Sequence, residues 1–223
     1  MDRALPAGSI AALEILRRTA ALAGRYPLRI AGWAAVLIGF SLAVDATEIG
    51  WDNASAGNFA ISVLCLIAQF GLTKSILGDL TGQVAGQPRF PAYFGLGIVT
   101  TIGIGLGTLA LVIPGIVLLV RWSLAVPILL SSDEEGVFDS IGRSWRETGP
   151  HFWPIFLVFL LIYGSITGLS FLGAAIEGEM RDNLAGTIIY DAATSLGLMF
   201  GWLAAIAIHH AVDDVVALQG VFE

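Results

Sequence analysis

The fold is decided by residues 94–130, which read FGLGIVTTIGIGLGTLALVIPGIVLLVRWSLAVPILL. Arg121 is the only charged residue in this stretch. One continuous helix over this stretch would measure about 55 Å, nearly twice the roughly 30 Å thickness of a bilayer core. Pro114-Gly115 stands near the middle and is a strong turn signal. The stretch therefore predicts two membrane-crossing helices joined in a tight hairpin.

The composition of the whole chain agrees with this setting. Of 223 residues, 56% are hydrophobic and 13% are charged, and the mean hydropathy is +0.82. An average soluble domain is about 25% charged, so this composition excludes a water-soluble enzyme and a disordered chain. The net charge of −7 argues against a nucleic-acid partner. A single cysteine, Cys65, excludes a disulfide framework and a multi-cysteine metal site.

Six stretches are long and apolar enough to cross a bilayer. Only helices and closed barrels satisfy the backbone in lipid, and these runs have helical length. We therefore predict an all-α fold, an integral membrane bundle of six transmembrane helices that forms a single domain over residues 1–223. The predicted spans are 28–44, 58–77, 94–113, 115–130, 152–174 and 186–209. Residues 1–27 are predicted to form a cytoplasmic or interfacial segment before them, and residues 210–223 a cytoplasmic tail after them.

The basic residues predict the orientation, because Lys and Arg accumulate on the cytoplasmic side. With the N-terminus inside, nine of them are cytoplasmic, Arg181 is outside and Arg121 lies within a span. Both termini are therefore expected in the cytoplasm. The nine residues are Arg3, Arg17, Arg18, Arg25, Arg29, Lys74, Arg89, Arg143 and Arg146.

Two amphipathic helices are predicted beside the spans. The first ends near Ala23, with Ser9 as its N-cap and a Glu14–Arg18 pair at i,i+4. Its pattern favours an interfacial helix, and the alternative is a short soluble helix packed on the bundle. The second is residues 138–153, FDSIGRSWRETGPHFW, whose aromatic residues suit the headgroup level.

Arg121 is the sharpest candidate for a functional site. An ionised side chain inside a span is costly and must find a partner. Counting from the Pro114-Gly115 turn places it about 9 Å below the outer surface, and Asp191 lies at about the same depth in the last span. Arg121, Asp191 and the adjacent Tyr190 are therefore the candidate binding set. The alternatives are a structural ion pair and an Arg121 side chain that reaches the outer headgroups.

Other motifs favour packing over chemistry. Gly103 and Gly107 form a GxxxG pair, which lets helices approach closely, and Pro114 and Gly115 are assigned to the hairpin. The same spacing recurs at Gly164/Gly168 and at Gly197/Gly201. His209, His210, Asp213 and Asp214 form two i,i+4 pairs that favour a polar helix end over a metal site. Tyr190-Asp191 and Gly78-Asp79 lie at different depths, which argues against an aspartyl protease.

A resemblance rests on residues 111–153. There the chain shows Pro114-Gly115, Arg121, Pro127, an acidic stretch at 133–135, and Ser144-Trp145 before Gly149. This pattern resembles the membrane domain of bacterial glycerophosphoryl diester phosphodiesterases and its stand-alone inner-membrane relatives. The family's usual Ala before the Ser is shifted or replaced by Ser140. The resemblance implies a six-helix module of the bacterial inner membrane with undefined activity, and it does not imply diesterase activity.

Three classes of function are compatible with a chain of this kind. The first is a non-catalytic module that handles lipid, senses it or acts as a scaffold, with membrane lipids, other membrane proteins or itself as partners. The second is a small transporter or channel that acts as an oligomer. The third is a membrane enzyme, for which the sequence shows no catalytic constellation, so no catalytic residue, metal or cofactor is predicted.

Overall fold

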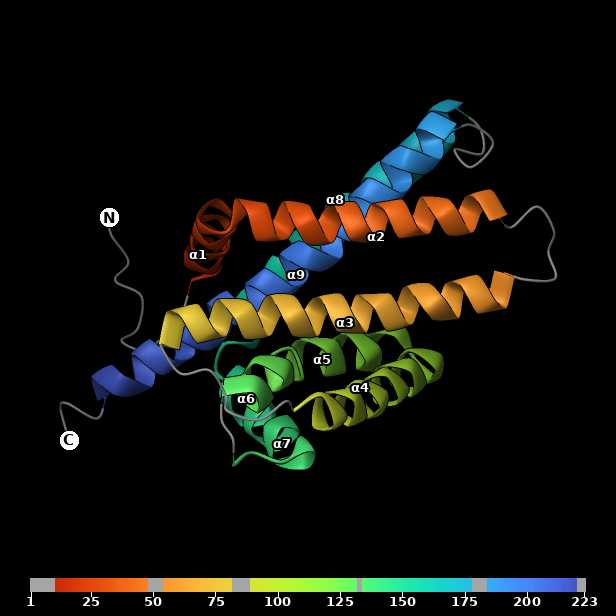
Figure 1. The fold of residues 1–223 in the computed structure, drawn as a ribbon. Coiled ribbons are helices and arrows are strands. Elements are labelled where there is room, and N and C mark those ends of the chain that lie inside the picture. The colour runs from red at the N-terminus through yellow and green to blue at the C-terminus, as the bar shows by residue number, and fades with distance from the viewer. Residues whose placement is uncertain (1–10, 48–53, 82–88, 132–133, 178–183, 220–223) are drawn as a thin grey trace, which may run out of the picture.

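The computed structural model describes residues 11–47, 54–81, 89–131, 134–177 and 184–219. Every regular element in this part of the chain is a helix, as predicted (Figure 1). Ser9, the predicted N-cap, lies outside the described residues. The helices are α1 (Ala12–Arg25), α2 (Pro27–Thr47), α3 (Ala54–Thr81), α4 (Phe90–Ala110), α5 (Val112–Arg121), α6 (Ala125–Ser131), α7 (Val137–Thr148), α8 (Phe152–Glu177) and α9 (Leu184–Gln219).

Six helical segments of the described chain are long and apolar enough to cross a membrane. They are α2, α3, α4, the α5–α6 unit, α8 and α9, which confirms the predicted number. Large apolar side chains cover their outer surface. Leu28, Leu109 and Ile113 are 86%, 85% and 73% exposed, and such a surface is stable only when lipid covers it. The chain is therefore a multi-pass membrane protein.

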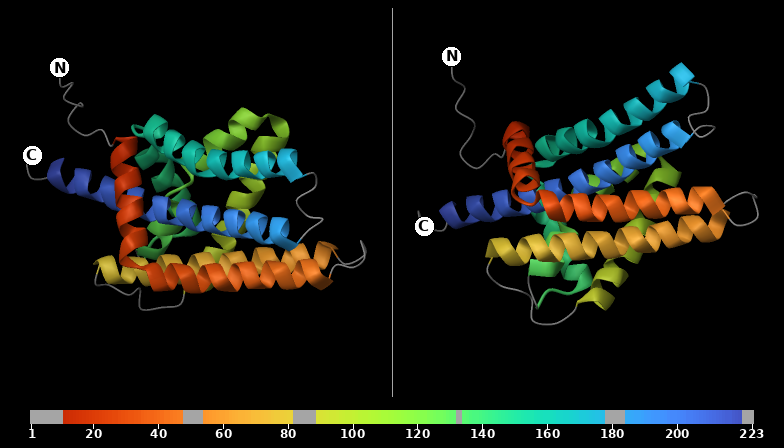
Figure 2. Two further views of the ribbon diagram at one scale, coloured as in Figure 1. Left: turned by 90° about the horizontal axis from the view of Figure 1, so that it is seen from above. Right: turned by 45° about the horizontal axis from the view of Figure 1, so that its top comes forward.

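Helix α9 is the centre of the bundle. It packs against α1, α2, α3, α6 and α8, and nearly every residue from Met199 to Val212 is buried. Figure 2 shows α2 and α3 on one side of α9 and α8 on the other. Two glycines of α9 let α8 approach closely. A Cβ atom at Gly197 would overlap Ile166 of α8, and one at Gly201 would overlap the hydroxyl group of Tyr163, also of α8. The matching positions of α8 do not do this, since Gly168 faces open space.

The predicted hairpin is present, but the turn is not at Pro114-Gly115. Helix α4 ends at Ala110 and α5 begins at Val112, so Leu111 makes the turn in an extended conformation. Pro114 lies inside the first turn of α5, where a missing backbone N–H leaves no helical hydrogen bond unmade. Gly115 provides the close approach instead, because a Cβ atom there would lie 2.8 Å from the Thr108 Cα.

The α4–α5 contact is lined by small residues. A Cβ atom at Gly107 would lie 2.9 Å from a methyl group of Leu118 and 3.2 Å from the backbone of Gly115, and one at Gly103 would overlap the Trp122 ring. Gly107 thus lets α5 approach α4 closely, while Gly103 makes room for the Trp122 ring just after α5.

Helix α1 lies across the end of the bundle, crosswise to α2 and α9 (Figure 2). Ile15 and Thr19 form its buried face, and the Thr19 hydroxyl donates to the Ile15 carbonyl oxygen. The predicted Glu14–Arg18 pair is present, with 2.9 Å between Oε1 and Nε.

Helix α7 exposes two large aromatic side chains and buries three hydroxyl groups. Phe138 is 75% exposed and Trp145 is 42% exposed, while Ser140, Ser144 and Thr148 are fully buried against the bundle. In water this arrangement would be inverted, so it fits a helix whose outer side meets the apolar edge of a bilayer.

Candidate functional site

The structure places Arg121 beside α7 and α8, not beside Asp191. Its Nη1 donates a hydrogen bond of 3.1 Å to the Trp145 carbonyl oxygen. Its Cζ lies 5.0 Å from the Trp145 ring centroid and 5.7 Å from that of Phe152. Gly149 provides the space, because a Cβ atom there would lie 2.8 Å from Nη1. Rings and a carbonyl group, rather than a carboxylate, therefore hold this cation.

The fourth span is not one helix, and Arg121 is the last residue before its break. Helix α5 ends at Arg121, residues 122–124 form a turn, and α6 begins at Ala125. Counting residues at constant helical rise gives a depth along the helix but not the direction in which a side chain points, so it did not show which helix Arg121 faces. The side chain contacts Trp145 of α7, so the alternative of a structural pair with Asp191 is not what the structure shows, while contact with the outer headgroups stays a prediction.

Ser144 of α7 bridges the break in the fourth span. Its hydroxyl donates to the Arg121 carbonyl oxygen at 2.7 Å and accepts from the Leu124 N–H at 3.2 Å. The Thr148 hydroxyl is also 3.3 Å from the same carbonyl oxygen. A broken helix at membrane depth needs such partners, because lipid supplies no hydrogen bonds. The sequence pattern did include Ser144, but its role required the tertiary contact.

Asp191 and Tyr190 lie in the second turn of α9, near the end of the bundle away from α7 (Figure 1). Asp191 is buried, whereas Tyr190 is 37% exposed. Neither makes an ion pair or hydrogen bond with Arg121 in the described chain. The structure therefore does not assemble the three predicted binding residues into one site.

Ion pairs join helices at one end of the bundle, which we call the ionic end and define by Arg18, Arg29 and Arg143. Arg18 links α1 to α9 through Asp214 at 2.7 Å, and Arg29 links α2 to α3 through Asp79 at 2.8 Å. Such exposed pairs contribute about 0–1 kcal/mol each, so they orient helices more than they stabilise them. Arg143 joins α7 to α9 through Asp213 at 3.6 Å, and also contacts Glu135 and Glu147.

The histidine–aspartate pairs of α9 belong to this same end. His209 Nε2 lies 3.4 Å from Asp213 Oδ2, and His210 Nδ1 lies 3.7 Å from Asp214 Oδ1. Both carboxylates also face arginines of other helices, which favours a structural role over metal binding. Within the described residues, no group of three His, Cys, Asp or Glu side chains is placed to hold a metal ion.

A cavity of about 200 Å³ lies inside the bundle, between α3, α4, the α5–α6 break, α8 and α9. We call it the central cavity. Gln69, Thr100 and Gly201, on its wall, are near the middle of their helices, so the cavity lies at the middle of these three candidate spans. Thr101 is at its rim and is exposed, so the cavity is reached from the side of the bundle. Its aromatic lining is Tyr93, Trp122, Phe159, Tyr163 and Trp202.

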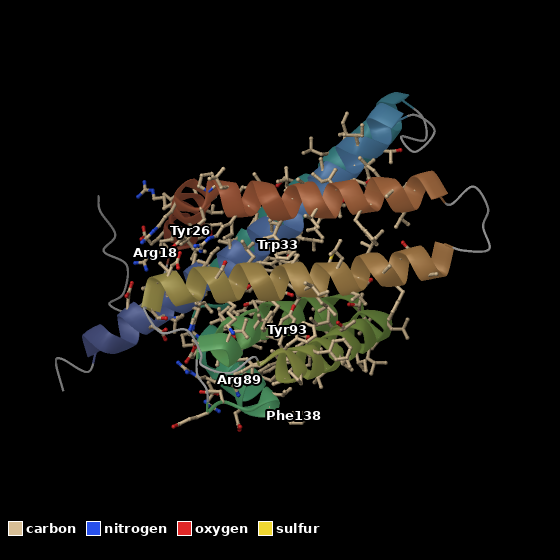
Figure 3. The ribbon with its side chains drawn as sticks, viewed as in Figure 1. Arg18, Tyr26, Trp33, Arg89, Tyr93 and Phe138 are labelled. Carbon is tan, nitrogen blue, oxygen red and sulfur yellow. The ribbon has the colours of Figure 1, made fainter. Side chains whose placement is uncertain are left out.

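The polar groups of the central cavity are uncharged hydrogen-bond donors and acceptors. The Tyr93 hydroxyl reaches from α4 to α3, where it lies 2.9 Å from Gln69 Oε1 and 3.0 Å from the Leu66 carbonyl oxygen (Figure 3). This contact occupies the acceptor end of the Gln69 amide and leaves its NH₂ group without a partner among the described residues. The Trp122 indole N–H is buried and also unpartnered within the described chain.

The sequence alone did not indicate this cavity. Its residues come from five helical segments and carry no charge, so no single stretch draws attention to them. Gln69 was the one available signal, because it is an amide in the middle of an apolar span.

Comparison of the chain with protein-family models, with curated proteins and with solved structures found no match in any of the three. The resemblance of residues 111–153 to the glycerophosphodiesterase membrane domain therefore stays a prediction.

Proposed function

We propose that this protein is a non-catalytic membrane module that binds a neutral lipid in the central cavity. The observation that carries the proposal is the chemistry of the cavity wall. Among the described residues that line it there is no Asp, Glu, Lys, Arg or His, while the Gln69 amide offers an unpaired NH₂ group. Such a wall favours a ligand with ester or hydroxyl oxygens and disfavours an ion.

The size and position of the central cavity support the same ligand class. About 200 Å³ is too small for a whole lipid but sufficient for the glycerol region of one, with its acyl chains outside in the bilayer. The exposed rim at Thr101 is where such chains would leave. The cavity lies at mid-depth, which a lipid without a charged headgroup reaches at little cost.

The proposal includes an orientation and a location. The basic residues of the described chain gather at the ionic end, and an excess of Lys and Arg marks the cytoplasmic side. We place both termini in the cytoplasm, and the protein in a bacterial inner membrane because of the family resemblance.

Native mass spectrometry of the detergent-solubilised protein with dioleoylglycerol tests the proposal. We expect one molecule bound per chain, and about tenfold weaker binding for Gln69→Leu, which removes the amide at nearly constant volume. Asn58→Leu is the matched control, because it removes an exposed amide from the same helix outside the cavity. We expect it to bind as the natural protein does.

Two results would overturn this function. One is the absence of one-to-one binding, or equal losses for Gln69→Leu and Asn58→Leu. The other is ion flux through the protein in liposomes without bound diacylglycerol, which would favour the small transporter or channel that the sequence left open.

A further inference from the structure

A second hollow lies at the ionic end, between α1, the end of α3 and the C-terminal part of α9. It has a volume of about 250 Å³, and we call it the α1 groove. Its floor is apolar and is formed by Ala21, Leu22, Leu80 and Ala207. It shares no residue with the central cavity, so a ligand in the α1 groove would bind independently of the neutral lipid proposed above.

The rim of the α1 groove carries more positive than negative charge. Arg18 and Arg25 stand on it, with Asp214 as the opposing carboxylate. Arg18 is held in place by Asp214 at 2.7 Å and by Glu14 at 2.9 Å (Figure 3). Arg25 is exposed, and its Cζ lies 5.6 Å from the Tyr26 ring centroid. No carboxylate pairs with Arg25 in the described part of the chain.

The surroundings of the groove place it at the edge of the lipid. Leu28, at the start of α2, is 86% exposed, and Leu13 on α1 is 58% exposed. Exposed apolar residues thus lie close in sequence to exposed arginines, as Leu13 does to Arg17 and Leu28 to Arg29. This combination is found at the boundary between acyl chains and headgroups.

We propose that the α1 groove binds one anionic phospholipid. Its phosphate lies against Arg25, with Arg18 as the second cation, and the first part of an acyl chain covers the apolar floor. Charge complementarity favours an anionic headgroup, since Arg25 lacks a carboxylate partner among the described residues. The apolar floor favours a lipid over a free anion, because a soluble anion would leave Ala21 and Leu22 exposed.

The experiment compares dioleoylphosphatidylglycerol with dioleoylphosphatidylcholine by native mass spectrometry of the full chain. The two lipids have the same acyl chains, so the comparison isolates the headgroup charge. We expect about tenfold tighter binding of phosphatidylglycerol, and an almost complete loss of that preference in Arg25→Gln. Arg17→Gln is the matched control, because Arg17 is an exposed arginine of the same helix that does not line the groove. The control should keep the preference.

A second variant tests the apolar floor. Ala21 is exposed on α1, so Ala21→Phe fills the groove with no change in charge and without disturbing the bundle core. We expect at least fivefold weaker phosphatidylglycerol binding in this variant, with the thermal midpoint of unfolding unchanged.

Several outcomes would overturn the proposal. The natural protein could show no preference for phosphatidylglycerol, or Arg17→Gln could reduce it as much as Arg25→Gln, which would indicate diffuse attraction. Unchanged phosphatidylglycerol binding in Ala21→Phe would show that the lipid does not lie on the apolar floor of the α1 groove. Displacement of the lipid by an equal concentration of glycerol 3-phosphate would identify a free-anion site. The α1 groove and the central cavity use different probes, so failure of one proposal is distinguishable from failure of the other.

Discussion

The Ser144 hydroxyl makes hydrogen bonds to both sides of a break in a membrane span. A serine on an amphipathic helix does not by itself indicate such a role. It is fully buried, and it satisfies a carbonyl oxygen at Arg121 and an N–H group at Leu124 that the interrupted helix leaves open. A buried backbone group without a partner costs about 1–3 kcal/mol.

Ser144→Ala should therefore lower the free energy of unfolding by about 1–3 kcal/mol, because no lipid group replaces the hydroxyl. Thermal unfolding in detergent measures the effect. Ser131→Ala is the control, since the Ser131 hydroxyl donates only to Ile128 of its own helix, and its effect should stay within about 0.5 kcal/mol. Equal effects of the two variants would show that Ser144 does not bridge the break.

His151, between α7 and α8, should make stability depend on pH. Burial lowers the pKa of His151 below its ordinary value. Above about pH 6.5 the imidazole is neutral in both states and has no effect. As the pH falls, the unfolded chain takes up a proton that the folded protein resists, so the free energy of unfolding decreases.

Replacing His151 by Gln should flatten the part of this dependence that it causes. The measurement is the thermal midpoint from pH 7.5 to 5.0 for both proteins. The midpoint of the natural protein should fall more steeply below pH 6.5. Parallel curves would contradict the assignment of this slope to His151.

At the scale of elements, the close packing of α4 against α5 depends on glycines, which have no side chain at the contact. Gly107 and Gly115 lie where two helix backbones meet, and a Cβ atom at Gly115 would be only 2.8 Å from the Thr108 backbone. Backbone atoms cannot move aside as a flexible side chain does, so the close approach depends on glycine.

Gly115→Ala should destabilise the protein by about 1–3 kcal/mol through this overlap. Gly105→Ala on α4 is the matched control, because nothing lies within 4 Å of the added methyl group. The control should be neutral or slightly stabilising, by up to about 1 kcal/mol, since Ala is the better helix former. A stable Gly115→Ala protein would mean that the two helices are not in such close contact.

At the scale of the whole molecule, the charges and the apolar surface together predict how the bundle sits in a membrane. The α1 helix, the α7 helix and the C-terminal part of α9 are joined by ion pairs at one end (Figure 1). An even number of crossings returns the chain to that end.

Labelling of single cysteines tests this orientation. In a Cys65→Ala background, an impermeant reagent added outside the cell should label cysteines at positions 49 and 180 but not at 83 and 136. After the membrane is opened, positions 83 and 136 should also react. Outside labelling at 83 would contradict the orientation, and outside labelling at only one of positions 83 and 136 would contradict the hairpin at residues 94–130.

The all-α class, the six spans and the α4–α5 hairpin were predictable because each depends on hydropathy and length along the chain. The Glu14–Arg18 pair was also predictable, since both residues lie on one helix at fixed spacing. The predicted position of the turn was wrong by a few residues. Pro and Gly are common in turns, but here Pro114 lies in the first turn of a helix and Gly115 lies against a neighbouring backbone.

The candidate site could not be predicted in this way, because it depends on contacts between helices that are distant in the sequence. Equal depth along two helices predicts a pair of Arg121 and Asp191, but depth does not determine the direction of a side chain, and Arg121 contacts Trp145 instead. The central cavity joins Gln69, Trp122 and residues of three further segments, none of which is unusual by itself.

By itself, the sequence determined that this protein resides in lipid, crosses it six times and has most of its cations on one side. These properties follow from the transfer of each segment between water and hydrocarbon, which depends on local composition. Only the tertiary structure decided which polar groups meet: Ser144 with the broken span, Arg121 with two aromatic rings, and Tyr93 with Gln69. Inside a bilayer the hydrophobic effect does not select helix partners, so the pairing is set by shape and hydrogen bonding between distant residues.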